Sequence, residues 1–276
     1  MKKGKMIISG LIITMILAFS LGNLGEKSAS AKAVSSYIVI EQSACKVIKG
    51  VNIHSRLPMA STTKIMTAYT VIKNEKNLDR IVCVPKEAVG IEGSSIYLKE
   101  GEELTIRELL YGLMLRSGND SAVALAIATK GSVENFVKQM NYESKLLRLQ
   151  NTNFTNPHGL HDDEHYTSAY DLAVITAEAY KYADFRDIVA TKSKVIGGVN
   201  SEKRHLINKN KMLLSYDGAN GVKTGYTKRS GRCLVSGAKR GETQLIAVAL
   251  NIPDTYGQCI YLLDYGFRHL NPDDID

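Results

Sequence analysis

The sequence predicts an α/β protein, layered in the α+β manner, in which one mostly antiparallel sheet is built from both ends of the chain. Short β-rich runs lie near the start and at the end of the 276 residues, and helical periodicity fills the middle. In a single domain, the first and last thirds must then share one sheet, while the middle third, roughly residues 75–185, forms a helical lobe. The cleft between two such lobes is a natural ligand site.

The first predicted elements are a β-hairpin and a helix. The β-rich runs Tyr37–Glu41 and Cys45–Val51 are separated by small and polar residues, which favours a hairpin. From Ser61 on, apolar residues recur at i, i+3, i+4 and i+7, the spacing of a core-facing helix. That stripe consists of Ile65, Ala68, Tyr69 and Ile72.

The segment "GEELTIRELLYGLMLRSGNDSAVALAIATKG" predicts two helices with a break at "RSGND". Thr105 and Glu108 have the spacing of a capping box for the first helix. Asn119 or Asp120 can cap the second helix, and Gly131 is placed to end it.

The rest of the chain returns from helix to strand. Helical patterns cover Phe136–Leu149 and Asp171–Ala183, with an irregular stretch between them. The runs "GVKTG", "GRCLVSGAKRG" and "TQLIAVALNIP" are β-like and broken by glycine turns, and "YGQCIYLLDYGF" is helical. These last strands are expected to join the N-terminal hairpin in the sheet.

Residues 1–31 have the three-part pattern of a Sec-type signal peptide. A basic head precedes an apolar run from Met6 to about Leu21, and small residues end at Ala31. We therefore expect an extracytoplasmic protein, secreted or associated with the cell wall or membrane, with a catalytic domain over residues 34–272. An uncleaved N-terminal anchor is the alternative, and it would be the only membrane contact.

Charge and cysteine content exclude several classes of function. The formal net charge of +7 falls to about +4 without the predicted signal peptide, and no Lys/Arg run with interleaved aromatics supports nucleic-acid binding. The four cysteines form no C-x-x-C pair, so buried free thiols are expected in place of a zinc site.

The pattern S-x-x-K occurs three times, and helical geometry separates the three. Residues i and i+3 share one face of a helix, so the Ser61 hydroxyl and the Lys64 amine can meet there. Ser43 and Ser236 lie in or beside strand-like runs, where the lysine at i+3 points to the opposite face. Thr62 does not share the face of Lys64, and neither does the adjacent Thr63, so these two hydroxyls are interpreted as structural. Ser61 is expected to be the first helical or N-cap residue, and on these residues alone it could be only an N-cap.

Two further motifs favour a chemical role for Ser61 over a purely structural one. Ser117-Gly118-Asn119 falls in the predicted interhelical loop, and Lys223-Thr224-Gly225 falls in a predicted strand. The three motifs in this order resemble the pattern of class A β-lactamases and penicillin-binding proteins. The longer runs "PMASTTKIMTA", "RSGNDSAVALA", "NPHGL", "YTSAYDLA" and "GVKTGYT" most resemble the low-molecular-weight penicillin-binding proteins that are D-alanyl-D-alanine carboxypeptidases, serine peptidase family S11. The resemblance extends from Tyr37 to Phe267.

The resemblance implies a five-stranded antiparallel sheet of the serine β-lactamase/DD-peptidase type and a penicillin-sensitive enzyme. Such an enzyme removes the terminal D-alanine from peptidoglycan stem pentapeptides that end in D-Ala-D-Ala, without a metal or other cofactor. Ser61 would be the acylated nucleophile, Lys64 its general base, and Ser117 the proton relay to the leaving amine. The backbone N–H groups of Ser61 and Tyr226 would form the oxyanion hole.

The same resemblance implies the substrate-binding residues. Asn119 would hold a peptide carbonyl, and Lys223 and Thr224 would line the strand beside the substrate, with Thr224 near its carboxylate. Gly225 would let the ligand backbone lie close. Elementary physical chemistry agrees, because burial and the nearby Lys223 would both lower the pKa of Lys64 and so allow it to accept a proton.

Two features depart from the longer members of the family. The chain stops at "RHLNPDDID", so neither a C-terminal β domain nor a basic amphipathic membrane anchor is expected. Some members also carry a carboxylate-binding arginine near the start of the last helix, where this chain reads Thr255-Tyr256-Gly257. The motifs leave open which cation besides Lys223 binds the carboxylate.

Three alternative interpretations remain at this point. His158, His161 and His165 could form a metal site, but Asp162 stands where a zinc helix needs glutamate and the stretch follows a loop pattern. A class A-like β-lactamase would need a glutamate that holds a deacylating water, and Glu164 lacks the sequence context for it. A non-catalytic cell-wall-binding protein on the same fold would not require the intact motifs.

Overall fold

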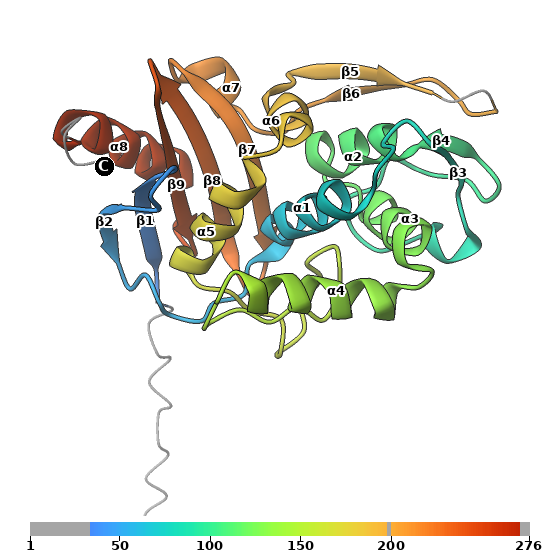
Figure 1. The fold of residues 1–276 in the computed structure, drawn as a ribbon, viewed down its shortest axis with the longest axis horizontal. Coiled ribbons are helices and arrows are strands. Elements are labelled where there is room, and N and C mark those ends of the chain that lie inside the picture. Colours follow the sequence, from blue (N-terminus) through green and yellow to red (C-terminus); the bar gives the residue numbers. More distant parts are fainter. Residues whose placement is uncertain (1–33, 198–199, 271–276) are drawn as a thin grey trace, which may run out of the picture. The chain divides into compact units, whose positions relative to one another are not determined.

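A five-stranded antiparallel sheet carries the fold, and both ends of the chain contribute to it (Figure 1). The computed structural model describes residues 34–197 and 200–270, which belong to one unit that begins at Val34. In the sheet the strand order is β2-β1-β9-β8-β7. The strands are β1 (Ser36–Glu41), β2 (Val47–Val51), β7 (Ala219–Thr227), β8 (Gly231–Arg240) and β9 (Thr243–Leu250). The pairing of β1 with β9 confirms that the two ends of the chain share the sheet.

Both faces of the sheet are covered by helices, which explains why the central strand β9 is apolar from Leu245 to Leu250. On β9, Leu245 and Ala247 face helix α8 (Thr255–His269), whereas Ile246 and Val248 belong to the core on the opposite face. This alternation follows from the two-residue period of a strand. Helix α5 (Ala169–Ala179) packs on that opposite face against β1 and β9.

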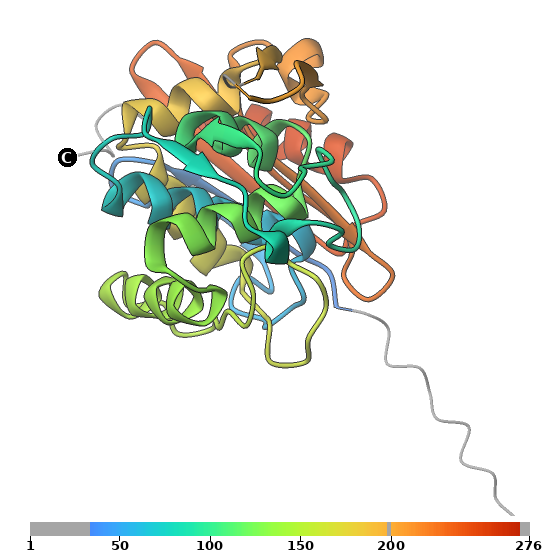
Figure 2. The same cartoon turned by 90° about the vertical axis from the view of Figure 1, so that its right-hand side faces the viewer.

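The helical lobe is built around one central helix, α1 (Lys64–Asn74), in which every residue from Lys64 to Ile72 is buried. Its four predicted core residues lie in this stretch, which confirms the predicted helix. Around it pack α2 (Ile106–Leu115), α3 (Asn119–Lys130), α4 (Val133–Leu146) and α6 (Ala183–Ala190). Figure 2 shows α2, α3 and α4 in green in front of the sheet.

The predicted helix ends are confirmed at two positions and wrong at one. Thr105 and Glu108 form a complete capping box at α2, and Gly131 ends α3 in the left-handed conformation with φ of 77°. The N-cap of α3 is Gly118, which has no side chain to contribute, and Asn119 is already helical. The side chains of Asn119 and Asp120 are used for tertiary contacts described below, which a local capping argument cannot foresee.

Several short elements were missed because they span too few residues to show a period. These are the 3₁₀ helices η1 (Ala60–Thr63) and η2 (Lys86–Ala88), the hairpin strands β3 (Ile81–Cys83) with β4 (Glu103–Thr105) and β5 (Ser193–Ile196) with β6 (Arg204–Ile207), and α7 (Met212–Ser215). Helix α6 was also absent from the prediction, which ran α5 on to Ala183.

The cysteine prediction is wrong for two of the four residues. Cys233 and Cys259 are buried free thiols as expected, but Cys45 is only half-buried and Cys83 is exposed on β3. The predicted signal peptide lies outside the described residues. Among the residues that are described, no helix combines the length and hydropathy needed to cross a membrane.

Candidate active site

Ser61 and Lys64 are brought together where the 3₁₀ helix η1 runs into α1. The Nζ atom of Lys64 lies 3.0 Å from the Oγ atom of Ser61. Ser61 is the second residue of η1, whose N-cap is Met59, so it is not the first helical or N-cap residue as expected. The preceding Ala60 has φ of 48°, an unfavourable conformation for alanine that costs about 1–3 kcal/mol and that tends to occur at functional sites.

The other two hydroxyls of the "STTK" run bond to the backbone. Thr62 Oγ1 donates to the carbonyl of Met59 at 2.6 Å, and Thr63 Oγ1 donates to the carbonyl of Ala60 at 2.7 Å. Both side chains are fully buried. They therefore stabilise the sharp entry into α1, in agreement with their structural interpretation from spacing.

The Lys64 amine is fully buried and surrounded by hydrogen-bond acceptors. Besides Ser61 Oγ, it donates to Asn119 Oδ1 at 2.7 Å and to the carbonyl oxygen of His158 at 2.5 Å. Burial lowers the pKa of Lys64 well below its ordinary value, and the positive charge of Lys223 lowers it further. This residue can therefore lose its proton at a pH where an exposed lysine stays charged.

The link between α2 and α3 places Ser117 and Asn119 beside this pair. Ser117 is buried and has φ of 66°, so its backbone is held in the left-handed region. Its hydroxyl makes no hydrogen bond to the described residues. Asn119 is fixed on three sides, since its backbone N–H donates to Ser94 O, its Nδ2 donates to Glu92 O, and its Oδ1 accepts from Lys64.

Strand β7 forms the opposite wall. Lys223 is buried and donates to its neighbour's carbonyl, Thr224 O, at 3.0 Å; burial, with a contribution from Lys209, lowers its pKa to about 7. A Cβ atom at Gly225 would lie 3.1 Å from the backbone nitrogen of Ser61. Glycine at this position therefore keeps the strand in close contact with η1.

One cavity connects these elements. Five of the sequence-predicted site residues line it directly, namely Ser61, Ser117, Thr224, Gly225 and Tyr226. The other three, Lys64, Asn119 and Lys223, are buried below its surface. The structure thus brings together residues from three segments far apart in the sequence.

The cavity has further lining residues that sequence analysis missed. The polar and charged ones are Ser94, Lys209, Lys211, Arg232, Thr255 and Tyr256. None belongs to a recognised motif, and no local periodicity sets them apart. Only the three cations, Lys209, Lys211 and Arg232, share a sequence signal, since they lie on either side of the third motif.

Comparison with known proteins identifies the family. A profile of D-alanyl-D-alanine carboxypeptidases, peptidase family S11, matches residues 25–254. The chain belongs to this S11 family. It is 36% identical to the D-alanyl-D-alanine carboxypeptidase DacF of Bacillus subtilis over 95% of its own length and 71% of that protein. The D-alanyl-D-alanine carboxypeptidase of Streptomyces sp. strain K15 is 32% identical, and the match covers 93% of this chain and 96% of that protein.

Solved structures are similar to this S11 chain over most of its length. The crystal structure of the Streptomyces K15 DD-transpeptidase has a TM-score of 0.79 at 32% identity, covering 84% of this chain and 96% of that one. DacD from Francisella tularensis has a TM-score of 0.78 at 26% identity, covering 84% and 70%. Against DacD of Escherichia coli, the S11 chain spans 59% of the relative's length.

The three histidines considered for a metal site in the S11 chain do not lie on a helix. His165 is buried, its Nδ1 accepts from Thr155 N at 3.0 Å, and its Nε2 lies 2.8 Å from Thr63 Oγ1. Burial lowers the pKa of His165 to about 4 and that of His158 to about 3, so both rings are neutral at pH 7. Across residues 34–197 and 200–270, no cluster of three or more His, Cys, Asp or Glu side chains could hold a metal ion.

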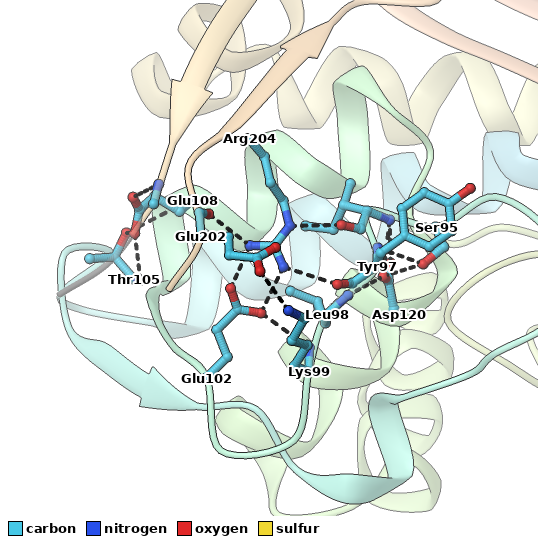
Figure 3. Close-up of polar contacts among 12 residues, drawn as sticks. Ser95, Tyr97, Leu98, Lys99, Glu102, Thr105, Glu108, Asp120, Glu202 and Arg204 are labelled. Atoms are coloured by element: carbon cyan, nitrogen blue, oxygen red, sulfur yellow. Dashed lines mark hydrogen bonds and ion pairs between the residues drawn. The ribbon is translucent and has the colours of Figure 1, made fainter. Parts of the chain in front are cut away.

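The S11 site is supported from outside by an arginine on the β5–β6 hairpin. Figure 3 shows Arg204 pointing into the loop that precedes β4. Its guanidinium pairs with both carboxylate oxygens of Glu102 and donates to Ile96 O at 2.8 Å and Tyr97 O at 2.9 Å.

Asp120, one residue after Asn119, accepts the backbone N–H of Ile96 in the same loop. This loop also contains Glu92 and Ser94, whose carbonyls accept from Asn119, so it is linked to the asparagine of the second motif.

We expect Arg204→Ala to lower the free energy of unfolding by about 3 kcal/mol, because it leaves the Glu102 carboxylate buried and unpaired. The Arg204 and Glu102 side chains are only 12% and 4% exposed. The matched control is Lys99→Ala, which removes the ion pair between Lys99 and Glu202. The side chains of this pair are 66% and 71% exposed. That loss should be below about 1 kcal/mol. Urea unfolding of both variants checks this, and equal losses would contradict it.

Proposed function

We propose that this S11 enzyme is a serine-type D-Ala-D-Ala carboxypeptidase that acts through an acyl-enzyme on Ser61. Its substrate is the peptidoglycan stem pentapeptide, from which it removes the terminal D-alanine, and penicillin acylates the same serine. The observation that carries the proposal is the 3.0 Å contact between the Ser61 hydroxyl and a buried lysine at the wall of a cavity. No cofactor is needed for this chemistry.

Lys64 is proposed as the general base. A neutral amine has two N–H donors and one lone pair, and the acceptors Asn119 Oδ1 and His158 O can take both donors. The lone pair is then directed at the third neighbour, Ser61 Oγ. The depressed pKa of Lys64 makes the neutral amine accessible, so the serine proton has an acceptor in place.

Acylation follows from this arrangement. Ser61 Oγ attacks the carbonyl carbon between the two D-alanines, and its proton passes to Lys64 Nζ. The oxyanion is stabilised by the backbone N–H groups of Ser61 and Tyr226. When the C–N bond breaks, the proton moves from Lys64 through the Ser117 hydroxyl to the leaving amine, and D-alanine departs. Among the described residues, the Ser117 Oγ has no hydrogen-bond partner that would compete with this relay.

Deacylation reuses the same groups. Water attacks the ester carbonyl of the acyl-enzyme and gives a proton to Lys64. The C–O bond to Ser61 then breaks, and Lys64 returns the proton to Ser61 Oγ. The shortened peptide leaves with a new carboxylate, and the enzyme is restored.

The remaining motif residues are proposed to bind the substrate. Asn119 uses one Nδ2 hydrogen on Glu92 O, which leaves its second hydrogen for a substrate carbonyl. Thr224 offers a hydroxyl for the terminal carboxylate. Lys223 supplies positive charge, and Gly225 leaves room for the peptide backbone beside β7.

The location of the substrate requires an enzyme outside the cytoplasm. The predicted signal peptide over residues 1–31 would export the chain, and the catalytic domain would then meet peptidoglycan directly. If this segment stays uncleaved, it would also contact the membrane.

The test is release of D-alanine from a pentapeptide ending in D-Ala-D-Ala, measured with an amino-acid oxidase assay. We expect D-alanine to accumulate, and to be suppressed after incubation with penicillin. A peptide ending in L-Ala-L-Ala is the matched control and should release nothing. Rapid destruction of the penicillin would favour a β-lactamase, and a folded protein inert to both compounds would favour a wall-binding protein.

A further inference from the structure

The cavity contains more positive charge than the three motifs account for. Lys209, Lys211 and Arg232 line it together with Ser61, and its lining contains no aspartate or glutamate. A cavity with this charge favours an anionic ligand. If the proposed function holds, that anion is the carboxylate of the terminal D-alanine, which lies on the leaving-group side of the scissile bond.

Arg232 is placed on the sheet beside Thr224. It is the second residue of β8 and lies directly opposite Tyr226 of β7, and Thr224 is opposite Leu234. Thr224 and Arg232 are therefore diagonal neighbours on the same face of the sheet, about 7–8 Å apart between their Cα atoms and within reach of a long side chain. Leu234 on this face packs against α8, whose first residues Thr255 and Tyr256 line the same cavity.

The guanidinium of Arg232 is free to bind a ligand. Its backbone is anchored, because its carbonyl accepts from Ile252 N at 3.2 Å. Its side chain is exposed and makes no hydrogen bond or ion pair with the part of the chain that the structure describes. Lys209, in contrast, already donates to Ser94 Oγ at 3.0 Å, so it ties the cavity wall to the loop that holds Asn119.

We propose that Arg232 binds the terminal carboxylate of the substrate through its guanidinium fork, with the Thr224 hydroxyl as a second donor. An arginine matches a carboxylate with two parallel N–H donors and stays charged at every physiological pH. Lys223 is less suited to this role, because it is buried and its pKa is lowered to about 7. Arg232 thus selects for peptides with a free C-terminus.

The test compares a D-Ala-D-Ala peptide with its C-terminal carboxamide. Arg232→Ala should lower kcat/KM for the free acid roughly 10- to 100-fold, the effect of losing a hydrogen-bonded charge pair, and change kcat/KM for the carboxamide by less than about threefold. Arg232→Lys should retain part of the activity on the free acid. The matched control is Arg229→Ala, which removes the same charge from the exposed β7–β8 turn outside the cavity lining and should leave both substrates unaffected.

Other outcomes would overturn this assignment. Equal losses on both substrates would mean that Arg232 supports the fold, and a selective loss in Lys211→Ala alone would give the carboxylate to Lys211. If the wild-type enzyme releases no D-alanine, the proposed function fails separately. Arg232 is then tested by the acylation rate with penicillin and with its methyl ester, followed by intact mass. A loss confined to the free acid supports the assignment, and no selective loss rejects it.

Discussion

Ser61→Ala is expected to abolish the covalent penicillin adduct and to lower kcat/KM for D-alanine release at least about 10⁴-fold, because no other hydroxyl can replace the nucleophile. Of the three hydroxyls in "STTK", only Ser61 contacts the Lys64 amine, since Thr62 and Thr63 are committed to backbone carbonyls. Intact-mass measurement after incubation with penicillin should show one adduct on the wild type and none on the variant.

Ser43→Ala is the matched control, since Ser43 is also followed by a lysine at i+3. Its hydroxyl donates to Glu41 at 2.9 Å in the β1–β2 turn. This variant should form the adduct at the wild-type rate. Persistence of the adduct in folded Ser61→Ala, with the label mapped to another serine, would contradict the assigned nucleophile.

Lys64→Arg is expected to lower both the acylation rate and kcat/KM by about 10³- to 10⁴-fold, because arginine keeps the positive charge but cannot act as a base. The substitution separates the positive charge of the lysine from its capacity to accept a proton. If only charge at this position mattered, the variant would stay active. Stopped-flow acylation by a chromogenic cephalosporin measures the effect, and Lys76→Ala, an exposed lysine just beyond α1, serves as the control.

The pH dependence of the wild type tests the same assignment. The neutral form of Lys64 is the active one, so kcat/KM should rise with pH as this residue loses its proton. Because burial and Lys223 lower its pKa well below 10.5, that rise is complete far below the pH at which an exposed lysine titrates. Above about pH 7, Lys223 loses its own proton and with it part of the positive charge that attracts an anionic substrate, so the rate should fall modestly while Arg232 stays charged. A profile that rises only near pH 10 would contradict a buried base.

The sheet and the main helices could be predicted because their evidence is local. The two-residue period of the strands and the i, i+3, i+4 stripe of α1 are written directly in the sequence, and the Thr105–Glu108 capping box follows from spacing alone. The Ser61–Lys64 contact belongs to the same class, since it joins neighbouring residues on one helical turn. The expected position of Ser61 as the first helical or N-cap residue was wrong because a 3₁₀ turn carries no sequence period of its own.

Local sequence patterns were enough to predict the motif residues and the order of the major elements, and the S11 resemblance followed from those motifs. The surroundings of the motif residues became known from the three-dimensional structure alone. The contact of Lys64 with the His158 carbonyl and the Arg204–Glu102 pair each join segments that are distant in the chain. Arg232 lines the cavity from a strand next to the one that carries the third motif. This division arises because local sequence encodes which side chains share a turn or a face. Contacts across the fold depend on how those faces pack against one another, and no local spacing specifies that packing.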